Sequence, residues 1–248
     1  MIANRLQKSL MFLMLIPLLV SACGGKVASP ATSQPAAQEP YAPAIDPANF
    51  VDKIDNAYMP LIPGTTFIYE GKTENGNEHV EVVVTSETKV SMGVTCIVVK
   101  DTVSVDGVVT EDTLDWYAQD KQGNVWYFGE DTKEFQDGKV SSTAGTWEAG
   151  VDGALPGIIM GANSAVGDTY RQEYYKGQAE DVAAVLSLSE SASVPYGSYS
   201  DLIMINEWNA LDNPAVYEHK YYAKGIGVVM TKYVEGGYEL RLIDIRHE

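Results

Sequence analysis

Residues 95–118 have the sequence TCIVVKDTVSVDGVVTEDTLDWYA, which predicts a β-hairpin. Its two halves are rich in Val, Thr, Ile and Tyr, residue types that are favoured in strands. The Asp106-Gly107 pair between them is typical of a tight hairpin turn, because both central residues of that turn need a positive φ. This stretch therefore predicts antiparallel strands that follow one another along the chain.

The same kind of turn recurs between other strand-like runs. Asn75-Gly76, Asp137-Gly138 and Gly236-Gly237 each lie between such runs. Helix signals are scarce: residues 50–56 are compatible with one helical turn, and residues 179–186 fit a helix or a strand. We therefore predict an all-β fold, a curved antiparallel meander that forms a half-barrel or open barrel with little helix.

Alternation along the predicted strands indicates that one face of the sheet is buried and that the other carries both polar and apolar side chains. Successive side chains of a strand point to opposite faces of the sheet. In residues 113–119 one face carries Leu114, Trp116 and Ala118, and the other carries Thr113, Asp115, Tyr117 and Gln119.

The chain begins with the features of an export signal. Arg5 and Lys8 precede an apolar run over residues 10–20, which is too short to span a bilayer comfortably. The tetrad Val20-Ser21-Ala22-Cys23 resembles the lipobox of bacterial lipoproteins. This resemblance implies that residues 1–22 are a signal peptide and that Cys23 becomes lipidated, with acyl chains such as palmitate.

A flexible tether is expected between the lipid and the folded part of the chain. Residues 23–46 are rich in Pro, Ala, Ser and Gln, and residues 47–248 are expected to form a single β-rich domain. Several acyl chains hold a protein on a membrane without a spanning helix. We therefore expect a lipid-anchored protein of the cell envelope, on the outer membrane and facing the periplasm if the host is Gram-negative.

The composition excludes several classes of function. With 17 Lys and Arg against 34 Asp and Glu, the formal net charge is −17, and such an acidic surface repels nucleic acid. The three histidines lack the spacing of a zinc site, and the serines lack the Gly-x-Ser-x-Gly elbow of α/β-hydrolases. We predict no catalytic residue, metal or cofactor, and we expect Cys96, in a strand-like run, to be a small buried hydrophobe.

Residues 141–168 interrupt the strand pattern. They combine several glycines with apolar residues and show no clear periodicity. A long loop without secondary structure is uncommon inside a compact domain and is often functional. Two interpretations stay open: a flap over the mouth of a curved sheet, or a connector that completes the core.

Aromatic residues concentrate on neighbouring predicted strands and suggest a ligand site. Cross-strand aromatic pairs stabilise hairpins by about 0.2–1 kcal/mol each, so a core role is one interpretation. An apolar pocket with a polar rim is the other. We expect an apolar or amphipathic ligand, or an envelope partner, and the candidate binding residues are Trp116, Trp126, Tyr127, Trp147 and Trp208.

Two other functions stay open beside this non-catalytic binding role. The many carboxylates are most simply solvated turn residues, but a pair such as Asp115 and Asp131 would suit a hydrolase of cell-wall glycan or another polymer. Alternatively, exposed strand edges would pair with a partner in an interaction scaffold. The absence of a catalytic motif favours binding over hydrolysis.

Three stretches resemble a family of uncharacterised secreted bacterial proteins. They are residues 56–61, residues 222–227 and residues 115–131, the last with the sequence DWYAQDKQGNVWYFGED. The resemblance covers most of the chain from Phe50 onward and implies no activity for any residue. The Val-Pro-x-Gly turn of residues 194–197 and the Tyr-Ala-x-Gly-x-Gly segment of residues 222–227 also resemble envelope proteins with curved antiparallel sheets, such as the LolA/LolB-like half-barrel of lipoprotein carriers. This resemblance implies a curved antiparallel sheet but not a function.

Overall fold

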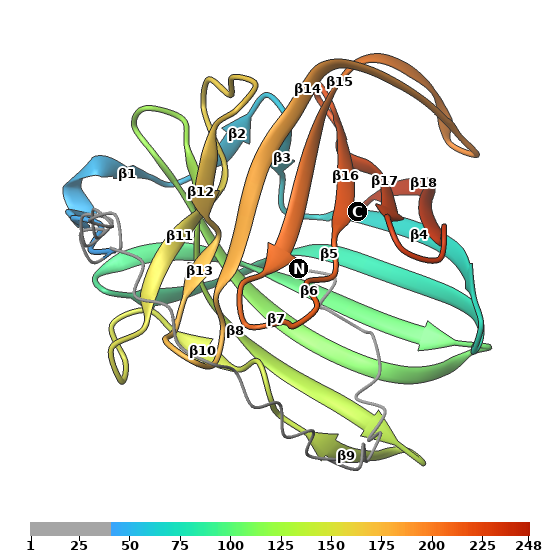
Figure 1. The fold of residues 1–248 in the computed structure, drawn as a ribbon. Helices are drawn as coiled ribbons and strands as arrows, with labels where there is room; N and C mark the ends of the chain where they lie inside the picture. The colour runs from blue at the N-terminus through green and yellow to red at the C-terminus, as the bar shows by residue number, and fades with distance from the viewer. Residues whose placement is uncertain (1–40) are drawn as a thin grey trace, which may run out of the picture. The chain divides into compact units, whose positions relative to one another are not determined.

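The computed structural model of the protein describes residues 41–248, of which Pro43–Glu248 form one compact unit. Strands make up nearly all of its regular structure (Figure 1), and the described residues contain one 3-10 helix, η1 (Pro47–Asn49), and no α-helix. Within residues 41–248 no helix is long and apolar enough to cross a membrane. The predicted signal peptide (residues 1–22), the predicted lipidation at Cys23 and most of the tether lie outside the described residues.

Sixteen strands belong to one sheet, in the order β12-β14-β15-β16-β17-β18-β4-β5-β6-β7-β8-β11-β13, with β1 beside β7 and with β9 and β10 beside β8. The remaining two, β2 and β3, form a separate pair. The bounds are β1 Phe50–Val51, β2 Ile54–Asn56, β3 Met59–Leu61, β4 Thr65–Thr73, β5 Gly76–Ser91, β6 Val94–Val105, β7 Val108–Asp120, β8 Val125–Gln136, β9 Lys139–Ser142, β10 Trp147–Glu148, β11 Leu155–Met160, β12 Thr169–Arg171, β13 Glu173–Tyr174, β14 Asp181–Val194, β15 Gly197–Asn209, β16 Glu218–Ala223, β17 Gly227–Tyr233 and β18 Glu239–His247.

The predicted hairpins are present, and the prediction of an all-β antiparallel fold is confirmed. β6 and β7 are joined at Asp106 and Gly107, whose φ angles of 47° and 81° are those that the turn requires. The ambiguous residues 179–186 mostly belong to strand β14. The helical turn considered for residues 50–56 is wrong: the short helix η1 precedes them, and they form β1 and β2.

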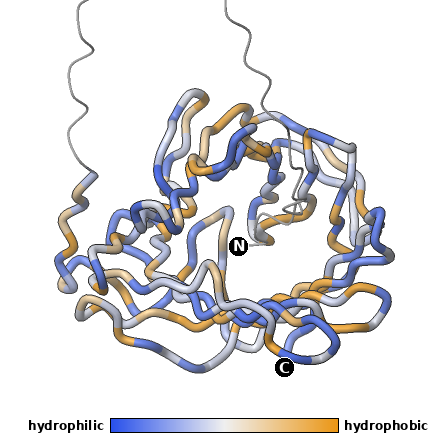
Figure 2. Tube along the Cα trace, turned by 60° about the horizontal axis from the view of Figure 1, so that its bottom comes forward, coloured by the Kyte–Doolittle hydropathy of each residue, from blue (hydrophilic) through white to orange (hydrophobic). Residues whose placement is uncertain are grey.

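The sheet curves into a nearly closed barrel with one open seam, and the ring of strands is visible in Figure 2. The segment from Thr169 to Tyr174 carries both edges of the sheet, because β12 pairs with β14 whereas β13 pairs with β11. At Gly157 of β11 a Cβ atom would lie 2.4 Å from the carbonyl oxygen of Gln172. Glycine at this position therefore lets the two backbones approach at the seam.

The glycine-rich residues 141–168 extend the sheet. β10 and β11 both pair with β8, and Trp147, Ile159 and Met160 are buried. The expectation of a stretch without strands is therefore wrong, and the connector interpretation describes this segment. Its buried apolar residues add to the core beside β8, whereas Val151 and Val166 are exposed.

The inner face of the barrel is more polar than simple alternation suggests. Thr113, Asp115 and Tyr117 of β7 lie on the inner side and are buried. Trp116, on the opposite face of the same strand, is also buried, and the Lys89 Nζ atom lies 4.0 Å from its ring centroid. Cys96 is buried as predicted, and burial raises the pKa of its thiol to about 12.

Candidate ligand-binding site

A cavity of about 110 Å³ lies inside the barrel. Its volume approaches that of an apolar protein cavity of about 150 Å³ that binds benzene, so a small molecule fits. Both apolar and polar side chains line it. The apolar lining consists of Met59, Pro60, Leu61, Phe67, Val82, Val99, Ile159, Ile226, Gly227 and Val228, and the polar lining consists of Tyr69, Asp101, Asp115, Tyr117, Lys220, Tyr222 and Thr231.

A short hairpin, residues 54–61, which we call the plug hairpin, forms part of the cavity wall. Its β3 strand contributes Met59, Pro60 and Leu61 to the lining. Asn56 holds the hairpin in place, since its Nδ2 atom donates to the Gly123 carbonyl at 2.8 Å and its Oδ1 atom accepts from the Tyr58 N–H at 2.8 Å.

Two further contacts attach the plug hairpin to the barrel. The Gln119 Nε2 atom donates to Asp55 at 2.8 Å, and the Gly225 N–H donates to the Ala57 carbonyl at 2.7 Å. The hairpin is thus bound at the β7–β8 turn and at the β16–β17 turn. These bonds fix its apolar strand against the cavity.

The three stretches singled out in the sequence meet at this site. Residues 56–61, 115–131 and 222–227 are far apart in the chain, yet each contributes residues to the cavity wall. The bonds from Asn56 and Ala57 connect the first stretch to the other two. The sequence signal that marks the site is therefore this set of stretches rather than the density of aromatic residues.

One wall of the barrel carries a cluster centred on Lys220, which we call the lysine cluster (Gln172, Glu207, Lys220 and Tyr222). The Lys220 Nζ atom lies 2.5 Å from Glu207 Oε2, and Glu207 Oε1 accepts from Gln172 at 2.9 Å and from Tyr222 at 3.3 Å. Burial alone would lower the pKa of Lys220, but the carboxylates of Glu207 and Glu218 outweigh it and raise the pKa. Lys220 therefore stays charged and neutralises Glu207.

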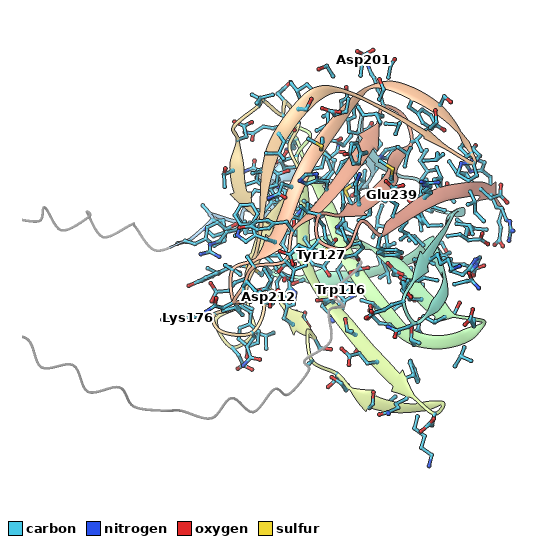
Figure 3. All side chains as sticks on the ribbon, turned by 45° about the vertical axis from the view of Figure 1, so that its right-hand side comes forward. Trp116, Tyr127, Lys176, Asp201, Asp212 and Glu239 are labelled. Atoms are coloured by element: carbon cyan, nitrogen blue, oxygen red, sulfur yellow. The ribbon has the colours of Figure 1, made fainter. Side chains whose placement is uncertain are left out.

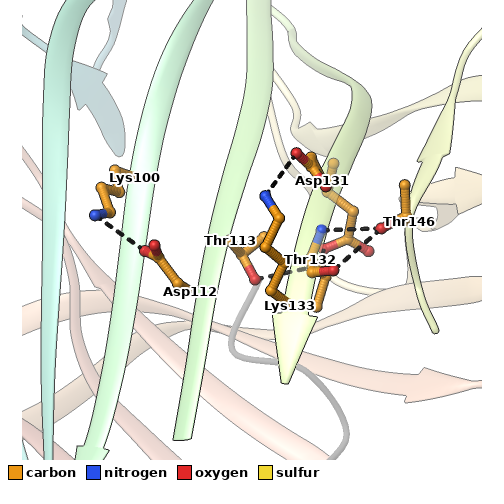
Figure 4. Close-up of polar contacts among 8 residues, drawn as sticks. Lys100, Asp112, Thr113, Asp131, Thr132, Lys133 and Thr146 are labelled. Carbon is orange, nitrogen blue, oxygen red and sulfur yellow. Dashed lines mark hydrogen bonds and ion pairs between the residues drawn. The ribbon is translucent and has the colours of Figure 1, made fainter. Parts of the chain in front are cut away.

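The opposite part of the sheet carries a second cluster on β7 and β8, which we call the tyrosine cluster (Glu111, Thr113, Asp115, Tyr127, Glu130 and Thr132). The Tyr127 hydroxyl donates to Asp115 at 2.5 Å, and the Thr132 hydroxyl donates to Glu130 at 2.9 Å. Figure 4 shows the bond from Thr113 to Thr132. It also shows the ion pairs of Lys100 with Asp112 and of Lys133 with Asp131.

Many carboxylates are buried, so the expectation that they are solvated turn residues is wrong for these. A carboxylate in a desolvated site tends to keep its proton. Accordingly, burial followed by the charge of Asp115 raises the pKa of Glu130 to about 8. Burial raises the pKa of Glu218 to about 7 even though Lys220 opposes the shift. Among residues 41–248 the buried carboxylates are Glu78, Asp101, Glu111, Asp115, Asp120, Glu130, Glu173, Glu207 and Glu218, and the buried lysine is Lys220.

The aromatic residues proposed from the sequence do not line the cavity. Tyr127 and Trp147 pack edge to face inside the barrel, with ring centroids 5.4 Å apart. Trp126 donates to Asp120 at 2.9 Å and packs against Phe50, and Trp208 packs against Tyr217. Figure 3 labels Trp116 and Tyr127, which come from neighbouring strands but lie on opposite faces of the sheet.

The carboxylate pair considered for hydrolysis is not brought together. Asp115 lies inside the barrel, whereas Asp131 is partly exposed and forms an ion pair with Lys133 at 3.0 Å. In the ladder between β7 and β8, Asp115 lies opposite Glu130, and Asp131 lies opposite Leu114. Within the described residues no group of three or more His, Cys, Asp or Glu side chains is placed to hold a metal ion.

No protein-family model matches the chain, and no curated protein sequence matches it either. Among solved structures, a presumed exported protein with a YmcC-like fold from Bacteroides fragilis is 14% identical, with a TM-score of 0.45. A presumed lipoprotein from Parabacteroides distasonis is 12% identical, with a TM-score of 0.42. Each comparison covers 77% of this chain and 99% of the other. Similarity this low does not establish a common fold.

Proposed function

We propose that the protein is a non-catalytic binding protein of the cell envelope, which holds a small molecule in the cavity beside the plug hairpin. The observation that carries this proposal is the cavity of about 110 Å³, which is lined by many apolar side chains and a smaller number of polar ones. Small-molecule sites are typically concave and mostly apolar, with a few polar groups that fix the orientation of the ligand.

The position of the protein in the cell is part of the proposal. A lipid on Cys23 would anchor the chain to a membrane, and the tether would let the barrel stand off its surface. The resemblance of residues 20–23 to a lipobox supports this anchor. An outer-membrane location would follow only in a Gram-negative host.

Native mass spectrometry tests the binding role. The sample is the mature chain, residues 23–248, with Cys23→Ser, purified without detergent and measured before and after denaturation and solvent extraction. We expect a mass excess that disappears on extraction, together with a small molecule in the extract. The matched control is Ile159→Trp, which fills the cavity and should abolish the excess. A bare mass for the parent chain at high protein concentration would count against a tightly held ligand.

A further inference from the structure

One hairpin turn carries a side chain that its backbone disfavours. Met92 and Gly93 join β5 to β6 with φ angles of 48° and 79°, close to the 47° and 81° of Asp106 and Gly107 in the next hairpin. Short polar side chains tolerate this backbone region, whereas a bulky apolar one is unusual there. Within residues 41–248 every other non-glycine residue with a positive φ is an aspartate: Asp106, Asp137, Asp152 and Asp201. The geometry of the turn therefore does not explain a methionine at this position.

Met92 is exposed together with two neighbouring apolar side chains. The exposed fraction is 40% for Met92, 63% for Val90 in the strand that leads to the turn, and 49% for Val151. The loop of Val151 contacts the Met92 turn, since a Cβ atom at Gly150 would lie 2.9 Å from Met92 Cγ. We call these three residues the apolar tip (Val90, Met92 and Val151). Exposed apolar side chains on adjoining segments are typical of an interaction surface.

The apolar tip lies where the chain enters the barrel. Pro43 begins the compact unit, and the short helix η1 follows it with no buried residue. A Cβ atom at Gly93 would lie 3.1 Å from Pro47 Cγ, so η1 lies directly beside the Met92 turn. A membrane that holds acyl chains on Cys23 would therefore be connected to the barrel next to the apolar tip.

The charges beside the apolar tip indicate which lipid surface suits it. Lys89 and Glu148 form an ion pair at 3.0 Å and neutralise each other. Asp46 precedes η1, Asp152 follows Val151, and both are exposed. With a formal net charge of −17 for the chain, an anionic lipid surface would be repelled. A bilayer surface without net charge is the better match.

We propose that the apolar tip is a membrane-contact site, which docks on the uncharged surface of the bilayer that holds the lipid on Cys23. This inference rests on the lipid anchor in the proposed function and adds which part of the barrel contacts the membrane. Apolar side chains that enter the boundary of the bilayer add their binding energy to that of the acyl chains.

A chain with one acyl group makes this contact measurable, because a single chain of about 14 carbons binds a membrane only marginally and reversibly. The mature chain, residues 23–248, is alkylated at Cys23 with a maleimide that carries one such acyl group. Cys96 does not compete, because it is buried and burial raises the pKa of its thiol. Sedimentation with phosphatidylcholine vesicles then measures how much protein is bound.

Met92→Asp removes the largest side chain of the apolar tip and should fold, because aspartate occupies the same position of the β6–β7 turn. We expect this variant to partition onto the vesicles about tenfold less than the parent. The matched control is Val108→Asp, which adds the same charge at a residue that is 60% exposed at the opposite end of β6 and should leave partition unchanged. Equal partition of Met92→Asp and the parent would overturn the proposal, and so would equal losses for the two variants.

Oxidation of the unsubstituted chain gives an independent measurement. The chain is coupled at Cys23 to two acyl groups, so that it stays on the vesicles, and is treated with hydrogen peroxide. We expect the vesicles to slow sulfoxide formation at Met92 but not at Met230, which is half-buried in β17. Equal rates at Met92 with and without vesicles would contradict the contact. Because the acyl groups are supplied chemically, such a result leaves the anchor intact, and the mass of the N-terminal peptide from cells tests that anchor separately.

Discussion

The lysine cluster and the tyrosine cluster lie on different walls of one barrel and accommodate buried carboxylates in different ways. In the lysine cluster Glu207 is compensated by the charge of Lys220 and by two further donors. In the tyrosine cluster Asp115 and Glu130 are partnered by hydroxyl groups of Tyr127 and Thr132. The difference teaches that one wall stabilises a buried carboxylate with an internal ion pair, whereas the other does so with hydroxyl donors and, at Glu130, with a retained proton.

Removing the internal cation should have the largest effect. Lys220→Met leaves Glu207 buried beside Glu218 without a positive charge, so we expect a loss of about 3–5 kcal/mol in the free energy of unfolding. Urea denaturation at neutral pH measures it. Lys232→Met, which removes a half-exposed ion pair with Glu239, should cost less than about 1 kcal/mol. Similar losses for both variants would show that the lysine cluster has no special role.

The tyrosine cluster should make the protein less stable as the pH rises. Glu130 keeps its proton in the folded state up to a pKa of about 8, whereas its ordinary value is 4.5. Between these values the folded chain binds more protons than the unfolded chain, so the free energy of unfolding falls from about pH 5 to pH 8.

The variant Glu130→Gln tests whether Glu130, rather than another buried carboxylate, causes this pH dependence. Relative to the parent, the variant should gain about 3–4 kcal/mol between pH 5 and pH 8, because glutamine still accepts the bond from Thr132 and does not ionise. Thermal unfolding across this pH range measures the difference. Parallel curves for the two proteins would exclude Glu130 as the titrating group.

Paired tyrosine variants compare the two clusters directly. Tyr127→Phe removes the hydroxyl that lies 2.5 Å from Asp115, and we expect a loss of about 1.5 kcal/mol. Tyr222→Phe should cost only about 0.5 kcal/mol, because Glu207 keeps Lys220 and Gln172 as partners. Denaturant midpoints measured side by side decide the order, and the reverse order would contradict the comparison.

The smallest effect concerns two threonines. Thr231→Val should change the free energy of unfolding by less than about 0.5 kcal/mol, because the hydroxyl has no partner within the described chain. Thr132→Val should cost about 1 kcal/mol, because it removes the bonds to Glu130 and Thr113. A large loss for Thr231→Val would mean that its hydroxyl is already engaged in the protein without ligand.

Local patterns were sufficient to predict the fold class. Asp106-Gly107 and the strand-like runs beside it specify a hairpin by backbone sterics alone, and such signals recur along the chain. Gly157 was harder to interpret, because its role depends on the backbone of Gln172, which reaches it only after the barrel has curved. Strands β10 and β11 were missed for the same reason: their pairing with β8 compensates for a weak local pattern.

The candidate site was predictable only in part. The three stretches that resemble the family of secreted bacterial proteins contain Met59, Asp115 and Tyr222 of the cavity wall. Lys220 was missed, because Glu218-His219-Lys220 has the composition of a solvated strand. Period-2 alternation places Glu218 and Lys220 on one face but does not say that this face points inward. That information lies in the contact with Glu207 on the neighbouring strand.

The pairing of β4 with β18 has a consequence for folding kinetics. Thr65 Oγ1 and His247 Nδ1 lie 3.3 Å apart, although 182 residues separate them in the chain. Closing so long a loop costs chain entropy before the contact yields any stabilisation, and topologies rich in such contacts fold slowly. The ring of strands cannot close until β18 is available, so the cavity should be among the last features of the molecule to form.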